Sequence, residues 1–191
     1  MQNNRFVATG DGRMAYSEDG VRWTAVNVRS IFGNAALTSI SAIAWGNNIW
    51  VAGGWGKMAY SADGVSWTEV ANSPFIVANG FYTINHIAWG NNRFVAVGND
   101  GKMAYSADGV SWTAVADTTI GSSTFFGIAW GNNRFVAGVY GGKMVYSTNG
   151  QSWTAVVDSA FGVDDNIQAL AYGNGRFVAV GANGKIAYCD W

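Results

Sequence analysis

The sequence predicts an all-β fold, because three patterns in it point to short strands that recur at a fixed interval. The segment Ile-Ala-Trp-Gly-Asn-Asn-Arg-Phe-Val-Ala-Val-Gly begins at Ile87 and returns with small changes at Ile43, Ile128 and Leu170. A second segment, Lys-Met-Ala-Tyr-Ser-Ala-Asp-Gly-Val-Ser-Trp-Thr, follows it at Lys57 and Lys102. The anchor tryptophans of these segments, at positions 23, 67, 112 and 153, are 44, 45 and 41 residues apart. Such a period is typical of solenoids, propellers and arrays, in which each unit packs only against its neighbours.

Each repeat contains four apolar runs that are separated by turn residues. In the third repeat we expect strands at 85–89, 93–97, 102–106 and 111–115, all rich in the β-branched and aromatic residues that favour strands. Gly90-Asn91-Asn92 and Asn99-Asp100-Gly101 join successive runs, and these residue types accept the positive φ of tight hairpin turns. Each repeat is therefore predicted to be a four-stranded antiparallel meander.

A meander of about forty residues that is repeated radially is a β-propeller blade. We predict a single β-propeller domain over 1–191 with about five blades, in repeats of approximately 1–38, 39–83, 84–124, 125–166 and 167–191. Both terminal blades are expected to be incomplete: the first lacks its first strand and the last lacks a full fourth strand. Imperfect closure of the ring and completion by another subunit both fit these ends, and a real closure is favoured over a frayed fragment.

Composition excludes several classes of function. With 49% hydrophobic and 12% charged residues, the chain is not disordered. The net charge is −1, and most basic residues occupy two repeat positions, so they should form rings and not the basic stripe that nucleic-acid binding requires. Those positions are Arg5, Arg93, Arg134 and Arg176, and Arg13, Lys57, Lys102, Lys143 and Lys185.

No apolar run approaches the ~18 residues of a membrane helix, so we expect no membrane insertion. Cys189 is the only cysteine, which allows no internal disulfide and no thiolate zinc site. The repeat pattern begins at Asn3, so no signal peptide is expected in this sequence. The sequence does not predict the cellular compartment. If the protein is exported, its leader peptide has been removed from this sequence.

The segment between the third and fourth strands resembles the Asp box of sialidase-like and BNR-repeat propellers. That box reads Ser-x-Asp-x-Gly-x-Thr-Trp, whereas this chain has Ser-Ala-Asp-Gly-Val-Ser-Trp at Ser61 and Ser106, one residue shorter. Gly-Asn-Gly-Arg-Phe-Val-Ala-Val-Gly at Gly173 is similar to repeats of bacterial exported propellers. The resemblance implies a propeller in which Asp63 and Asp108 are structural, accepting backbone N–H bonds while Trp67 and Trp112 pack between blades. It does not indicate one function, since such blades carry lectins, hydrolases, assembly factors and scaffolds alike.

The two faces of a propeller should differ in this chain. Turns between the first and second strands are nearly invariant, whereas turns between the second and third strands, and the loops that join blades, differ in every repeat. Variable loops on a rigid scaffold are where binding normally occurs, although surface loops also drift without selection.

Candidate ligand-binding residues are therefore the aromatic, amide and acidic residues of these variable loops. Aromatic rings flanked by amides and carboxylates suit sugar recognition, but a phenylalanine in such a loop more often fills the gap between blades. Trp55 and Tyr140 lie in tight turns and are the best candidates for exposed contacts. The full set is Trp55, Tyr140, Asp100, Asn183, Asn34, Asn79, Tyr82 and Asp165.

An enzymatic function is not expected, and neither is a cofactor or a metal site. A glycosidase needs two carboxylates that face each other across the sugar, whereas Asp164 and Asp165 are adjacent. His86, the only histidine, has no orienting group beside it in the sequence and is interpreted as a structural strand residue.

Three functions remain: a protein-interaction scaffold, a multivalent carbohydrate-binding lectin, and a designed or amplified propeller without a dedicated ligand. We favour the scaffold over the lectin, because repeated sugar sites should look alike and these loops do not. The expected partner is a protein or a glycan, and a homo-oligomer that forms through the incomplete terminal blades is a further possibility.

Overall fold

The computed structural model describes residues 5–33, 39–77 and 80–190, which form five antiparallel sheets and one small hairpin. The sheets correspond to the predicted blades, and the all-β propeller fold is confirmed. We number the blades 1 to 5 and call the strands of a complete blade A to D.

Each blade is a meander in which every strand pairs with the next one along the chain. Blade 1 has three strands, β1 (Phe6–Gly10), β2 (Arg13–Ser17) and β3 (Thr24–Val26). Blade 2 has four, β4 (Ala42–Gly46), β5 (Ile49–Gly53), β6 (Met58–Ser61) and β7 (Thr68–Glu69). Blade 3 has β10 (Ile84–Gly90), β11 (Arg93–Gly98), β12 (Met103–Ser106) and β13 (Thr113–Ala114). Blade 4 has β14 (Phe125–Gly131), β15 (Arg134–Val139), β16 (Met144–Ser147) and β17 (Thr154–Ala155). Blade 5 has three, β18 (Ile167–Gly173), β19 (Arg176–Gly181) and β20 (Ile186–Asp190).

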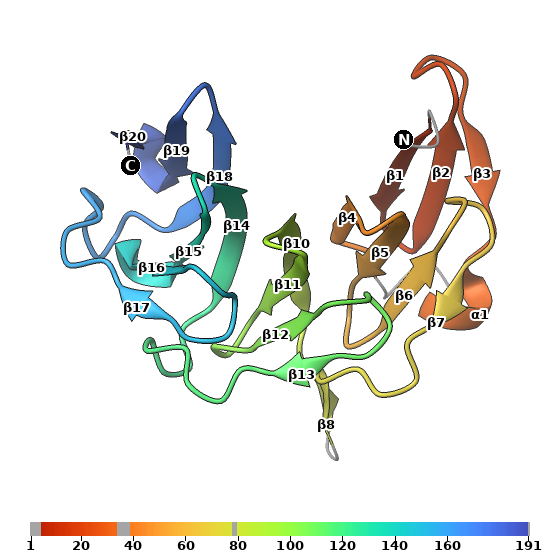
Figure 1. The fold of residues 1–191 in the computed structure, drawn as a ribbon, viewed down its shortest axis with the longest axis horizontal. Helices are drawn as coiled ribbons and strands as arrows, with labels where there is room; N and C mark the ends of the chain where they lie inside the picture. Colours follow the sequence, from red (N-terminus) through yellow and green to blue (C-terminus); the bar gives the residue numbers. More distant parts are fainter. Residues whose placement is uncertain (1–4, 34–38, 78–79, 191) are drawn as a thin grey trace.

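The terminal blades are incomplete as predicted, because blade 1 begins at a B strand and blade 5 ends at a C strand within the described residues. The five blades follow one another around an arc, and the first and last blades stand apart across its open side (Figure 1). The favoured expectation that the ring closes on itself is therefore wrong for this structure. Within 5–33, 39–77 and 80–190, no strand of either terminal blade pairs with the other terminal blade.

The A–B turns have the geometry that their residues favour. Asn91 and Asn92 join β10 to β11 with φ of 45° and 52°. Two successive positive φ values define a type I′ turn, whose twist matches that of the strands it connects. The A–B turns of blades 2 and 4 repeat this geometry, so the turn prediction is confirmed.

Side chains from two neighbouring blades form each core cluster. Between blades 3 and 4, fully buried Val95, Met103, Phe135 and Val145 pack with Trp153. Equivalent clusters lie between the other consecutive blades. We call these four apolar clusters seams.

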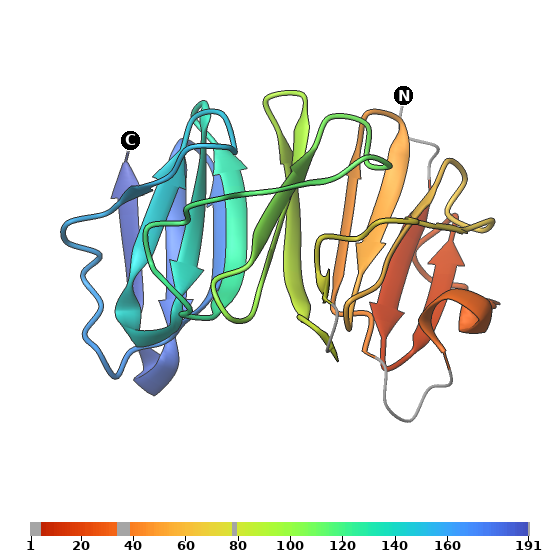
Figure 2. The ribbon, with the colours of Figure 1, turned by 90° about the horizontal axis from the view of Figure 1, so that it is seen from below.

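The inter-blade loops contain structure that the repeat pattern does not predict. A single helical turn, α1 (Arg29–Phe32), follows blade 1, and a hairpin of β8 (Ile76–Val77) and β9 (Gly80–Phe81) follows blade 2. Short 3₁₀ turns η1 (Tyr140–Gly142) and η2 (Ala182–Gly184) form two of the B–C turns. Viewed from the side, α1 and β8 lie at one end of the strands and both chain termini at the other (Figure 2). No helix among the described residues is both long and apolar enough to cross a membrane.

Candidate functional site

The turns between the C and D strands, which we call Asp boxes after their sequence, are closed by hydrogen bonds between side chains and backbone. In blade 2 the Oδ1 atom of Asp63 accepts the backbone N–H groups of Val65 and Ser66 at 2.8 and 2.7 Å. The Ser61 hydroxyl donates to the same carboxylate at 2.9 Å and accepts the N–H of Gly64 at 2.8 Å. These bonds favour the charged carboxylate, the Ser66 N–H most strongly, and lower the pKa of Asp63 to about 2.

The same geometry recurs in the other boxes, including the one in which asparagine replaces aspartate. Asn149 in blade 4 accepts the N–H groups of Gln151 and Ser152 at 2.9 Å through its amide oxygen. The turn therefore requires an acceptor oxygen and not a charge. This makes a catalytic or metal-binding role for the box aspartates unnecessary to explain their recurrence.

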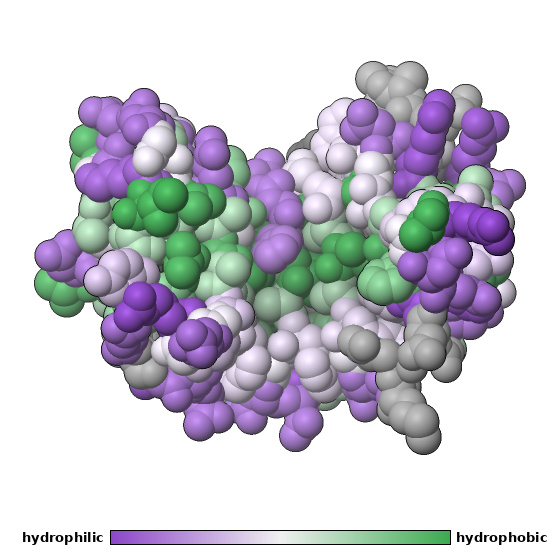
Figure 3. All heavy atoms as spheres, turned by 90° about the horizontal axis from the view of Figure 1, so that it is seen from above, coloured by the Kyte–Doolittle hydropathy of each residue, from purple (hydrophilic) through white to green (hydrophobic). Residues whose placement is uncertain are grey.

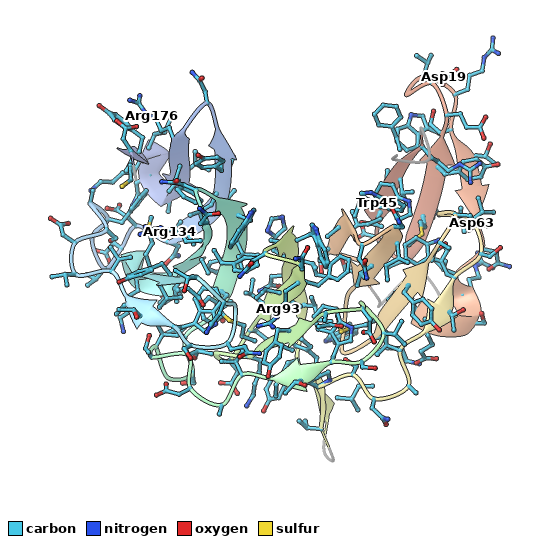
Figure 4. All side chains as sticks on the ribbon, in the orientation of Figure 1. Asp19, Trp45, Asp63, Arg93, Arg134 and Arg176 are labelled. Atoms are coloured by element: carbon cyan, nitrogen blue, oxygen red, sulfur yellow. The ribbon has the colours of Figure 1, made fainter. Side chains whose placement is uncertain are left out.

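The repeated arginine joins blade 1 to blade 2 and blade 3 to blade 4, a role that the sequence pattern does not reveal. In blade 3 the Arg93 guanidinium donates to the Asn149 carbonyl of blade 4 at 2.5 Å and lies 5.0 Å from the ring centroid of Tyr105. Arg5 of blade 1 likewise donates to the carbonyl of Asp63 in blade 2. Arg93, Arg134 and Arg176 lie on successive blades around the arc, as expected of a ring of basic residues (Figure 4).

The A strands of blades 2 to 4 each end in a glycine against which the next blade places an aromatic ring. A Cβ atom on Gly131 would lie 2.0 Å from Cγ of Tyr172, and one on Gly90 would lie 2.1 Å from Trp130. Only a residue without a side chain permits this approach. A Cβ atom on Gly173, the equivalent residue in blade 5, would have none of the surrounding described atoms within 4 Å.

The variable face consists of the B–C turns and the inter-blade loops. Backbone bonds hold the two together: the Gly56 N–H donates to the carbonyl of Tyr82 at 3.1 Å, and the Tyr140 N–H donates to that of Thr124 at 2.8 Å. Trp55 is 40% exposed and Tyr140 is 57% exposed, as expected of contact residues in tight turns. Trp55 forms an isolated bridge with Thr83, so its backbone is anchored.

Four further candidates fall into two groups on this face. Tyr82 is half-buried under the Lys102 ammonium, which lies 4.8 Å from the ring centroid, and Asp100 is exposed in the neighbouring turn. In blade 5, Asp165 accepts the Gly162 N–H at 2.9 Å and the Lys185 ammonium at 3.0 Å.

Those two contacts lower the pKa of Asp165, the Gly162 bond being the larger cause. Asn183 reaches the same carboxylate at 3.4 Å. Asp165 and Asn183 therefore brace their loop, whereas Trp55, Tyr140 and Asp100 are directed outward. Asn34 and Asn79 lie outside the described residues.

The loop phenylalanines largely serve the core. Phe32, Phe75 and Phe125 are buried, which agrees with the expectation that such rings fill gaps between blades. The structure adds two exposed valines, Val157 and Val163, in the loop between blades 4 and 5. The sequence patterns did not predict the exposure of these two valines, although a valine that lies outside any strand pattern is a usable signal for an exposed contact.

The only histidine of the chain contacts the neighbouring blade. His86 lies in β10, and its Nδ1 atom accepts the N–H of Ile128 in blade 4 at 3.1 Å. Burial lowers the pKa of this imidazole. No group of three or more histidine, cysteine, aspartate or glutamate side chains within 5–33, 39–77 and 80–190 could hold a metal ion.

A cavity of about 190 Å³ lies in the seam between blades 4 and 5. Its walls are mostly apolar and include Met144 of blade 4 and Leu170, Phe177 and Cys189 of blade 5. The sequence patterns gave no indication of it.

No protein-family model and no curated protein sequence matches the chain. Its similarity is to solved β-propeller structures. Over 96% of this chain it superimposes with a TM-score of 0.68 and 18% identity on YCF48 bound to D1 peptide. The computationally designed Ika4 protein matches 81% of the chain with a TM-score of 0.60 and 17% identity. The GH74 xyloglucanase from Xanthomonas campestris matches 97% with a TM-score of 0.69 and 13% identity.

At these identities the similarity establishes the propeller fold alone. The chain spans 59% of the YCF48 chain, 92% of Ika4 and 34% of the xyloglucanase. The neighbours thus include a propeller bound to a peptide, a designed protein and a glycosidase.

Proposed function

We propose that this chain is a non-enzymatic binding scaffold that engages a protein partner through the variable face. The observation that carries the proposal is the contrast between the two faces. The Asp-box face repeats the same turns, whereas the opposite face presents different exposed residues in each blade, among them Trp55, Asp100 and Tyr140. A single asymmetric partner fits such a surface better than a set of identical small ligands. The similarity to a propeller bound to a peptide supports this class of partner.

The carboxylates support a non-enzymatic function. Asp63 is occupied by backbone N–H groups and Asp165 by Lys185 and backbone, so neither is available as a general acid at neutral pH. The short Asp box, with its Ser-Asp hydrogen bonds, supports placing the chain among BNR-like propellers in which this turn is structural. We propose that its five repeats act as one domain.

The test begins with binders selected from a random peptide library displayed on phage. For a selected peptide we expect Trp55→Ala or Tyr140→Ala to weaken the dissociation constant at least tenfold, because an exposed aromatic in a tight turn is a typical interface anchor. The control is Val110→Ala, an equally exposed apolar residue in the Asp box of blade 3. Unchanged affinity in both aromatic variants would overturn the assignment of the variable face.

A carbohydrate-binding function is the second candidate, and the exposed rings of Trp55 and Tyr140 beside polar turns favour it. Weak sites on several blades would gain avidity on a multivalent glycan. A glycan-array screen of the same sample decides between the two: binding to one glycan class that is lost in Tyr140→Ala would replace the peptide partner with a sugar. A designed or amplified propeller without a ligand, which the likeness to Ika4 supports, predicts no binding in either screen.

Association of copies through the terminal blades is a separate proposal. Val178, Val180 and Ile186 are exposed on the outward face of blade 5, and apolar side chains gather over this C-terminal blade, on the left in Figure 3. Phe6 and Trp23 are exposed on the outward face of blade 1. These two faces are the halves of a seam, so one copy can pack head to tail on another. Light scattering should then give a defined oligomer that Ile186→Asp dissociates, and a monomer at all concentrations would contradict this.

A further inference from the structure

The seam between blades 4 and 5 differs from the other three seams in one side chain, a tryptophan. The seam between blades 1 and 2 includes Trp67, the next includes Trp112, and the one between blades 3 and 4 includes Trp153. Each of these tryptophans directly precedes the D strand of the later blade. The seam between blades 4 and 5 has no such tryptophan among the described residues, because β20 is the last strand of blade 5.

The cavity lies in this fourth seam, and its walls are the counterparts of residues that surround Trp153. Leu170, Phe177 and Ala179 line the cavity, and they correspond in the repeat to Ile128, Phe135 and Ala137. Those three are at most 1% exposed and pack with Trp153 in one cluster, the rings of Phe135 and Trp153 lying 6.4 Å apart. The cavity therefore occupies the place of a fourth-strand indole. An apolar cavity of about 150 Å³ accommodates a benzene ring, so about 190 Å³ is of the right size for an aromatic side chain.

The strand beside the cavity, β20, lies at the edge of its sheet among the described residues. In blade 3, β12 pairs with β13 through Ala104 opposite Ala114 and Tyr105 opposite Thr113, and the Val115 N–H donates to the carbonyl of Met103 at 2.8 Å. Blade 4 repeats this register with Val145 opposite Ala155 and Tyr146 opposite Thr154. In blade 5 the equivalent strand β20 pairs with β19, and within the described residues no strand lies on its other side.

We propose that the edge of β20 and the adjoining cavity form a binding site for an extended peptide segment with the pattern Trp-Thr-Ala-Val. The peptide adds as the fourth strand of blade 5, antiparallel to β20. Its tryptophan enters the cavity beside Phe177, its threonine lies opposite Tyr188, and its alanine lies opposite Ala187. The backbone supplies affinity through strand addition, and the indole supplies specificity.

The sequence of this peptide is inferred from the other blades of the same chain. Three equivalent seams contain Trp67-Thr68, Trp112-Thr113 and Trp153-Thr154. An aliphatic side chain in place of the peptide tryptophan would leave part of the cavity empty. A polar side chain there would lose its hydration on contact with Met144 and Leu170. The site uses the edge of blade 5 and the side of its sheet that faces blade 4, and Asp158, Ser159 and Ala160 of the loop between these blades also line the cavity. It does not include Trp55 or Tyr140 of the variable face.

The experiment uses the full chain and a fluorescently labelled peptide with the sequence of residues 107–117, Ala-Asp-Gly-Val-Ser-Trp-Thr-Ala-Val-Ala-Asp. We expect saturable binding of one peptide per chain by fluorescence anisotropy, and at least tenfold weaker binding when the peptide tryptophan is replaced by alanine. Binding that does not depend on this tryptophan would overturn the proposal, and so would no binding at all.

Cys189 supplies a second readout, because it lines the cavity and is the only cysteine. Saturating peptide should slow modification of its thiol by a maleimide at least fivefold, and protein modified beforehand should bind the peptide at least tenfold more weakly. The matched control is Cys189→Ser, which has the residue found at positions 61, 106 and 147, and its affinity for the peptide should be the same before and after maleimide treatment. Binding without protection of Cys189 would place the peptide elsewhere and reject the site. Trp55→Ala should leave this binding unchanged, so the outcome is independent of the variable-face proposal.

Discussion

The seam between blades 3 and 4 and the outward face of blade 5 carry nearly the same side chains in opposite environments. Val95 and Val97 are completely buried in the seam, whereas their repeat counterparts Val178 and Val180 are 36% and 38% exposed. The two strands, β11 and β19, have the same sequence, and each pairs with the A and C strands of its own blade. The comparison teaches that burial in this array is decided by the presence of a neighbour, because each unit supplies only half of every apolar contact.

The largest expected effect contrasts two phenylalanines at the same repeat position. Phe135→Ala removes a fully buried ring and should lower the free energy of unfolding by about 3–5 kcal/mol. Phe6→Ala removes a ring that is 54% exposed and should cost less than about 1 kcal/mol. Urea denaturation of both variants measures the difference. Equal losses would mean that the outward face of blade 1 is covered in solution.

A second contrast uses the glycines at the ends of the A strands. The side chain introduced by Gly131→Val would overlap the ring of Tyr172. Overpacking of this kind lowers the free energy of unfolding by about 1–3 kcal/mol. Gly173→Val meets open space and should be neutral or slightly stabilising, since valine favours strands and restricts the unfolded chain. Thermal unfolding of the pair compares them directly. If Gly173→Val is as damaging as Gly131→Val, a ring from another chain lies against blade 5.

The smallest effect concerns the bond that joins His86 in blade 3 to Ile128 in blade 4. Burial lowers the pKa of His86 in the folded protein, so below pH of about 6.5 the unfolded chain binds more protons than the folded one. The free energy of unfolding should therefore fall as pH decreases through this range toward the lowered pKa of the folded state. Because Asp63 has a pKa of about 2, its own contribution is lost only at much lower pH.

The control for this pH dependence is His86→Gln, which removes the only histidine. Urea denaturation at pH 7 and pH 5 should show a smaller loss of stability in this variant than in the parent chain. The same loss in both proteins would show that the histidine makes no contribution to the pH dependence.

Much of the fold could be predicted from the sequence because strand, turn and repeat signals agree in every unit. The strands 85–89 and 93–97 correspond to β10 and β11, and the asparagine turns adopt the expected positive φ. The D strands are shorter than predicted, since β13 has only two residues. The hairpin β8–β9 and the helical turn α1 were missed because each occurs once, and a repeat pattern carries no information about unique loops.

The candidate site was less predictable for a physical reason. Exposure of Trp55 and Tyr140 follows from their place in tight turns, so local sequence sufficed for them. The open arc and the cavity beside Cys189 depend on which units meet in space, and no single repeat encodes that. The arginine contacts between blades were hidden in the same way, because Arg93 and its acceptor Asn149 are 56 residues apart.

The glycine that ends each A strand has a consequence for how such a chain changes during evolution. The A strands of blades 2 to 5 each end in an aromatic residue followed by a glycine, and in blades 2 to 4 the ring of the next blade covers that glycine. Duplicating or deleting one such unit therefore preserves this ring-on-glycine contact at the new junction. Unequal recombination can change the blade number without a compensating substitution at this contact.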